Sequence, residues 1–122
     1  MADIVDVKLL MITTLNTKFS TYPVYLQGSL SDEDDYPDSF FTYWNNSTND
    51  DAFFDNVETQ TLWDLDLNFY SNDPVLVNSV LLEAKKALKA VGFIIDGSGY
   101  DVISDEPTHT GRGINLIYIQ RK

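Results

Sequence analysis

A chain of 122 residues that is 43% hydrophobic and 13% aromatic can build one folded core, although its formal net charge is -11. The absence of cysteine excludes disulfide bonds, a thiolate zinc site and a cysteine nucleophile. The excess of acid argues against tight binding of nucleic acid, because such binding needs cations on the phosphates. We therefore expect a single domain over residues 1–122.

The N-terminal residues and the hydropathy pattern give no sign of a membrane. Residues 1–4 lack the basic flank and apolar run of a signal peptide. No stretch approaches the roughly 20 apolar residues that span a bilayer. We expect a soluble protein that is not secreted and has no membrane partner.

The acidic residues are concentrated in one tract. No Lys or Arg occurs between Phe19 and Ala84, whereas most of the acidic residues lie there. Such a run is usually a solvated surface. The four consecutive acids at residues 32–35 lack the spacing and the glycine of a calcium loop, so we expect a solvated loop there as well.

Residues 3–26 predict one helix and one short strand. Apolar residues recur at three- and four-residue spacing from Asp3 to Lys18, which is typical of an amphipathic helix. Asp3 is the expected N-cap, and the chain leaves the helical conformation before Pro23. Residues 24–26 follow as a short strand. The apolar helix positions are Ile4, Val5, Leu9, Ile12 and Leu15, with Val7, Met11 and Phe19 beside them.

Two more strands are expected before the second helix. Residues 39–44 have a β-rich composition, and residues 45–51 read as a polar loop. Residues 58–70 alternate between apolar and polar side chains, which predicts a strand with one core face and one wet, negative face. Its length of about 13 residues exceeds the usual five or six, which suits projection beyond the sheet and pairing with another subunit. The core face is Trp63, Leu65, Leu67 and Phe69, and the wet face is Asp64, Asp66 and Asn68.

The second helix has clear start and stop signals. Asp73 is the expected N-cap, Pro74 suits the first helical position, and Gly92 is the expected left-handed cap. Val75 and Leu82 lie opposite the apolar stripe, where they are either tolerated surface residues or part of a subunit contact. The stripe is Val77, Val80, Leu81, Ala84, Ala87, Leu88 and Val91.

The C-terminal part predicts a hairpin, a loop and a last strand. Residues 93–95 and 100–103 flank a glycine-rich turn at 96–99, which suits a hairpin. A loop at 104–113 leads into a nearly continuous apolar strand at 114–120, expected at the centre of the sheet. The order of elements predicts an α+β fold with two helices packed on a mostly antiparallel β-sheet.

Two acidic groups are weighed as metal or catalytic sites. Asp105, Glu106 and His109 do not share a helical face, because a proline lies between them, and no second histidine or cysteine completes a site. Asp64 and Asp66 share a strand face, but no nearby basic residue would stabilise developing charge. We expect no metal, no cofactor and no catalysis, and keep a magnesium-dependent enzyme using Asp64 and Asp66 as a distant alternative.

Arg112 is an isolated cation set between Gly111 and Gly113. Glycine on both sides allows unusual backbone angles or the close approach of another chain. We expect Arg112 to pair either with Asp101 or Asp105 of its own fold or with the acidic tract of a neighbouring subunit.

The C-terminal segments resemble a bacteriophage family. Residues 69–74 (FYSNDP), 92–95 (GFII), 99–102 (GYDV) and 105–113 (DEPTHTGRG) are similar to the tail terminator, or tail completion, proteins of long-tailed siphophages. The pattern is a strand, a helix that ends in Gly-Phe, a hairpin, a Thr-Gly-Arg turn and a final strand. Residues 1–68 match the family only in element order and length.

This resemblance implies a structural virion protein that is not an enzyme. Such a subunit forms a ring, expected to be a hexamer, at the head-proximal end of the tail tube, where it stops tube polymerisation and joins tail to head. The implied partners are the tail tube protein and a head–tail connector protein, and DNA passes without specific binding. The implied location is the virion tail, and the host cytoplasm during assembly. Another head–tail connector or a minor tail protein is the related alternative.

The resemblance and the residue pattern together give two sets of site candidates. Heterologous ring contacts need exposed loops and strands, and acid on a channel wall would keep passing DNA from sticking. The interface candidates are Arg112, Gly111, Gly113, His109, Asp105, Val75 and Leu82. The channel-facing candidates are Asp64, Asp66, Asp34 and Asp35.

Overall fold

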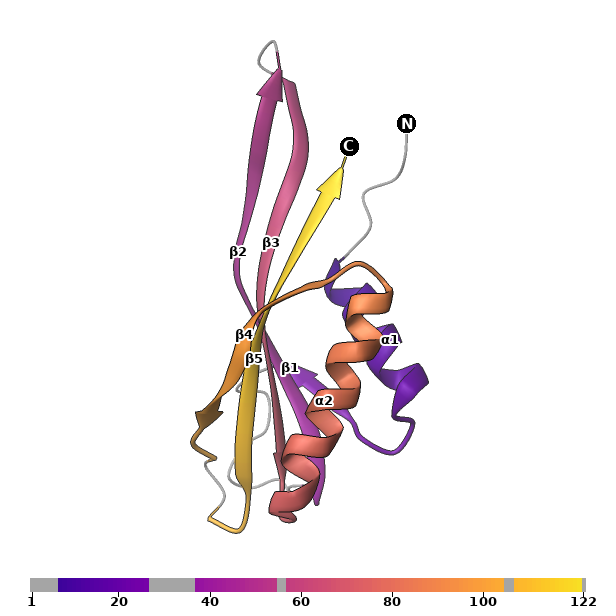
Figure 1. Ribbon diagram of the computed structural model, residues 1–122, viewed down its shortest axis with the longest axis vertical. Coiled ribbons are helices and arrows are strands. Elements are labelled where there is room, and N and C mark those ends of the chain that lie inside the picture. Colours follow the sequence, from indigo (N-terminus) through magenta and orange to yellow (C-terminus); the bar gives the residue numbers. More distant parts are fainter. Residues whose placement is uncertain (1–6, 27–36, 55–56, 105–106, 122) are drawn as a thin grey trace.

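Two helices lie on the same side of a mostly antiparallel sheet, which confirms the expected α+β class (Figure 1). The computed structural model describes residues 7–26, 37–54, 57–104 and 107–121. The elements are α1 (Val7–Lys18), β1 (Val24–Leu26), β2 (Ser39–Phe54), β3 (Val57–Ser71), α2 (Pro74–Ala90), β4 (Ile94–Val102) and β5 (Thr110–Arg121). The predicted succession of a helix, three strands, a helix and further strands is therefore correct.

The strands of the described residues form one sheet in the order β1-β2-β3-β5-β4. β1 runs parallel to β2, and the other neighbouring pairs are antiparallel. β3 pairs along its length with β2 on one side and β5 on the other. β5 lies between β3 and β4, so the prediction that the last strand is internal is confirmed.

The alternation of side chains along β3 decides which face of the sheet contributes to the core. Leu65, Leu67 and Phe69 are fully buried on the side that carries the helices. Their neighbours in the sheet, Phe41 of β2 and Leu116 of β5, are buried with them, because paired residues share a face. The rest of the buried core comes from Val7, Met11, Leu15, Val80, Leu81, Ala84, Leu88, Phe93 and Ile114.

The ends of α2 follow the predicted signals. The Asp73 side chain accepts a hydrogen bond from the Val75 backbone N–H at 3.0 Å, and Pro74 occupies the first turn. At the other end Gly92 has φ of 105°, and the Phe93 N–H donates to the Leu88 carbonyl at 3.1 Å. This arrangement caps the helix with a left-handed glycine and drives Phe93 into the core.

The buried stripe of α1 differs from the prediction. Val7, Met11 and Leu15 are fully buried, whereas Leu9 is 60% exposed. The stripe that packs on the sheet repeats every four residues, so Leu9 points away from it. Asp3 and the first apolar positions, Ile4 among them, lie outside the described residues. Within the part of the chain that the structure describes, no helix is long and apolar enough to cross a membrane.

The predicted polar loop at residues 45–51 is wrong, because β2 continues through it to Phe54. The polar residues of β2 pair with the first half of β3, for example Asp50 with Thr61. Cross-strand hydrogen bonding overrides their weak strand propensity. The register shifts between Asn45 and Ser47, which absorbs one extra residue as a bulge.

The predicted hairpin at residues 93–103 is also wrong. Both of its halves belong to β4 and pair with β5, Asp96 with Asn115 and Tyr100 with Gly113. The intervening residues bulge out of the ladder, where Gly97 and Gly99 supply positive φ angles of 78° and 106°. β5 begins at Thr110, so the Gly-Arg-Gly segment lies in a strand and not in the predicted loop.

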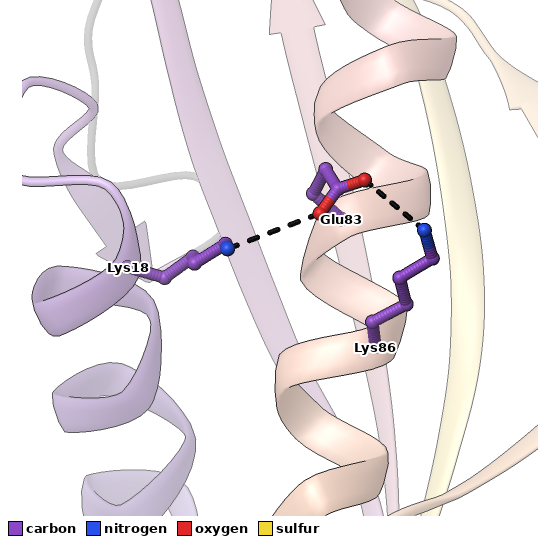
Figure 2. A network of polar contacts seen from close by, with 3 residues as sticks. All are labelled: Lys18, Glu83 and Lys86. Atoms are coloured by element: carbon purple, nitrogen blue, oxygen red, sulfur yellow. Dashed lines mark hydrogen bonds and ion pairs between the residues drawn. The ribbon is translucent and has the colours of Figure 1, made fainter.

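An exposed ion-pair network links the two helices (Figure 2). Glu83 of α2 lies 3.8 Å from Lys18 of α1 and 3.2 Å from Lys86, one turn further along α2. All three side chains are about half exposed or more, so solvent screens their attraction. The helix pair is therefore held by its buried apolar residues.

Comparison of one core residue with one ion-pair residue tests this conclusion. Leu88→Ala should lower the free energy of unfolding by about 2–5 kcal/mol, because Leu88 is fully buried. Glu83→Gln should change it by less than about 1 kcal/mol. Urea unfolding of both variants measures the two values, and a larger loss for Glu83→Gln would overturn the assignment.

Candidate functional site: the helix-free face of the sheet

The side of the sheet opposite α1 and α2 is called here the helix-free face. Strand register aligns its residues in rows that cross four strands. One row is Trp44, Asp66, Asn115 and Asp96, taken from β2, β3, β5 and β4. The next row contains Asp64 of β3, with Ile117 and Ile94 beside it. The face therefore combines carboxylates with large apolar side chains.

The two carboxylates of β3 are held by neutral donors. Asn115 Nδ2 donates to Asp64 Oδ1 at 2.6 Å and to Asp66 Oδ1 at 3.2 Å. Asn46 Nδ2 reaches Asp64 Oδ1 at 3.3 Å, and the Tyr100 hydroxyl donates to Asp66. Hydrogen bonds from amides and a phenol satisfy the oxygens but leave both negative charges in place.

Tyr100 is the titratable group that this arrangement perturbs most clearly. Partial burial raises the pKa of Tyr100 from 10.0 to about 12, and the charge and hydrogen bond of Asp66 act in the same direction. A phenol with a pKa this high is a poor general acid or base near neutral pH. Its hydroxyl serves here to orient Asp66.

The described residues contain no group of three or more His, Cys, Asp or Glu side chains that could hold a metal ion. Asp64 and Asp66 do lie together on one strand face, as the sequence predicts, with the Asn115 amide between them. The magnesium-dependent alternative rests on this shared strand face alone.

Gly111 and Gly113 make room for tyrosine rings on the helix-free face. A Cβ atom at Gly111 would lie 2.5 Å from Tyr70 Cδ1. A Cβ atom at Gly113 would lie 2.7 Å from Tyr100 Cε2 and against the buried Asn68 side chain. Both glycines are buried in β5, so they serve packing within this sheet.

Arg112 points to the other side of the sheet, toward α2. Its Nη1 lies 2.8 Å from Asp101 Oδ1, so the pairing within its own fold that the sequence allows is present. The Asp101 side chain is 91% exposed, and such a pair contributes little to stability. Arg112 also lines a shallow groove with Leu82 and Lys85 of α2.

His109 joins two distant segments. Its Nε2 lies 2.8 Å from the Pro37 carbonyl oxygen, and its ring centroid lies 5.9 Å from that of Phe40. These contacts fix the approach to β5 against the start of β2 and give the side chain a packing role.

The remaining candidates divide between exposed positions and undescribed ones. Val75 and Leu82 are 75% and 51% exposed on the outer face of α2, so both are accessible to a partner. Asp34, Asp35 and Asp105 lie outside the described residues.

Two features of this site lack a clear signal in the sequence. The role of Asn115 depends on strand register, which brings it between Asp64 and Asp66 from the far end of the chain. The exposure of Trp44 depends on which face of β2 meets the helices. The sequence of residues 39–44, where four of the six residues are aromatic, does not show that choice.

No known family model matches this chain, and no curated protein matches it. The similarity of residues 69–121 to tail terminator proteins therefore stays a prediction from the sequence.

Alkaline titration tests the Tyr100 environment. The folded state favours the neutral phenol, so this stabilisation is complete below about pH 10 and is lost as pH rises through about 12. Tyr100→Phe should remove the latest step of the tyrosinate absorbance titration and weaken the fall in stability over that interval. An unchanged late step in the variant would show that another tyrosine carries it.

Proposed function

We propose that this protein is a structural virion subunit that forms a ring on the head-proximal end of a siphophage tail tube. The ring stops tube polymerisation and offers a surface to the head connector. The observation that carries the proposal is the long β2–β3 hairpin, whose outer edge is available to another chain. The family resemblance of residues 69–121 supplies the identity of the assembly.

The hairpin extends beyond the rest of the sheet. β1 pairs only with residues 41–43 of β2, so from Trp44 to Phe54 the outer edge of β2 has no strand partner in the described chain. Figure 1 shows the hairpin rising past both helices. Free N–H and C=O groups along such an edge readily pair with a strand from another molecule.

The contact that this edge supports is heterologous. The opposite edge of the sheet is β4, which is shorter and interrupted by its glycine bulge. When the β2 edge of one copy binds a different surface on the next copy, repetition of this contact generates a closed ring or an open filament. Closure of the ring is what a tube-capping subunit requires.

The charge of the chain agrees with a protein that DNA passes during ejection. A net charge of -11 repels phosphates and prevents nonspecific binding. An acidic channel wall is part of this proposal, with Asp34 and Asp35 among its candidate residues.

A shortened hairpin tests the proposed role. Residues 51–60 are replaced by Asn-Gly, which joins Asp50 directly to its partner Thr61. Asp50 lies four residues before Phe54, and Thr61 lies four residues after Val57, its partner in the last pair of the ladder. Hydrogen-bonded and non-hydrogen-bonded pairs alternate along an antiparallel ladder, so a shift of four positions keeps the same type of pair next to the turn. The core residues named above are retained. We expect a folded monomer, measured by thermal melting, that no longer forms rings.

Light scattering and negative-stain images of the full chain, alone and with the tail tube protein of the same phage, measure assembly. Wild-type rings that stop tube growth support a terminator. Rings that join the head connector but leave tube length unlimited would favour the connector alternative. A wild-type chain that stays monomeric with the tube protein would overturn the proposal, as would intact rings from the shortened variant.

Arg112 gives a second test with a matched control. Arg112→Ala and Asp101→Ala remove the same ion pair, whose carboxylate is 91% exposed, so loss of the pair itself should change monomer stability by less than about 1 kcal/mol. If Arg112 contacts a neighbouring subunit, Arg112→Ala should weaken assembly more than Asp101→Ala does. Equal melting loss with intact rings in both variants would restrict Arg112 to a role within its own chain.

A further inference from the structure

The described charges are separated between the two sides of the molecule. Six cationic side chains lie on the side that carries the helices: Lys8, Lys18, Lys85, Lys86, Lys89 and Arg112. On the helix-free face the charged residues of the two rows described above are Asp64, Asp66 and Asp96. This part of the helix-free face is therefore negative, whereas the side that carries the helices has these six cations together with the acids Glu83 and Asp101.

The helix-free face also exposes large apolar side chains beside its acids. Trp44 is 48% exposed, Ile94 49% and Tyr100 41%. Exposed aromatic and aliphatic groups of this size suit a protein contact, because burying them releases water. They do not suit a wall that faces DNA and solvent. A partner for this face needs apolar groups and cations together.

The outer face of α2 has this composition. Val75, Leu82 and Lys89 are spaced seven residues apart and so lie on one line along the helix, opposite the buried stripe, with Lys86 next to them. Lys86 and Lys89 are exposed, as are Val75 and Leu82. The helix thus presents apolar groups in its first half and cations in its second half.

The order and spacing of the groups on the two surfaces also match. Along the row of the helix-free face, Trp44 lies three strand separations from Asp96, roughly 14 Å, with Asp66 between them. On α2, Leu82 and Lys89 are separated by seven residues, roughly 10 Å, and the lysine side chain adds reach. A helix laid across the strands therefore places Leu82 near Trp44 and its lysines near Asp66 and Asp96.

We propose that the helix-free face of one copy binds the outer face of α2 of a second copy, with Leu82 against Trp44 and Lys89 against Asp96. The pairing is heterologous, since the two surfaces lie on opposite sides of the subunit. It rests on the proposed function and adds a second contact between neighbouring copies to the one that the β2 edge makes. It assigns Asp64 and Asp66 to a contact between subunits instead of the channel wall.

Charge reversal at two exposed positions tests the contact. Asp96→Lys and Lys89→Glu should each weaken self-association, because each places like charges opposite one another. We expect roughly a tenfold or greater rise in the dissociation constant for each variant. Mixing the two variants should restore assembly, since every contact in an alternating ring is then complementary. The double variant on one chain should assemble as well.

Controls separate the contact from net charge and from folding. Asn16 is exposed on α1, away from the proposed surface, so Asn16→Glu and Asn16→Lys change the net charge without changing the contact. Both should assemble as the wild type does. Melting temperatures of all variants check the fold, and mass by light scattering at low and high salt measures association.

The outcomes distinguish this inference from the proposed function. If the wild type forms rings and the reversed variants form them equally well, the contact is wrong and the ring stands. If rings fail for the single variants and return in the mixture, the contact is supported. If the mixture restores filaments that never cap a tube, the contact stands and the terminator role falls. A wild type that never associates would overturn both.

Discussion

The alternation of side chains along β3 is the constraint on which the rest of the structure depends. Leu65, Leu67 and Phe69 point to the helices, and Asp64 and Asp66 point to the other side. A slip of one residue in register would bury the carboxylates and expose the core, which costs both the hydration of the charges and the burial of the apolar side chains. Because β3 lies between β2 and β5, its register also decides which side chains of these two strands face the helices.

The two glycines of β5 determine how side chains pack on the helix-free face of the sheet. Without side chains at Gly111 and Gly113, the rings of Tyr70 and Tyr100 lie over the strand. Tyr100 is thereby brought within hydrogen-bonding reach of Asp66. The Gly-Arg-Gly segment suggested an intersubunit loop in the sequence, and in the fold its glycines serve packing on one side while its arginine faces α2 on the other.

Charge is distributed by layer in the folded protein. The acidic tract of the sequence includes β2 and β3, whereas the described lysines lie on α1 and α2. A subunit whose helix-free face carries acids and whose helices carry lysines is suited to pairing front to back, and it resists pairing of like faces. The projecting β2–β3 hairpin adds a strand edge that has no partner strand among the described residues.

Local signals in the sequence were sufficient for the elements with strong caps or strict periodicity. The Asp73-Pro74 start, the Gly92 end and the core face of β3 could all be predicted, because each depends on residues close together in the chain. Asn68, expected on the wet face of β3, is buried instead. The α+β class followed from their order. Tertiary structure alone decided the features that depend on pairing between distant segments. The polar residues 45–51 became strand because β3 lies beside them, and residues 93–103 joined β5 instead of each other. The meeting of Asn115 with Asp64 and Asp66, and the placement of these two acids on the side of the sheet away from the helices and their lysines, likewise arise from register and layering.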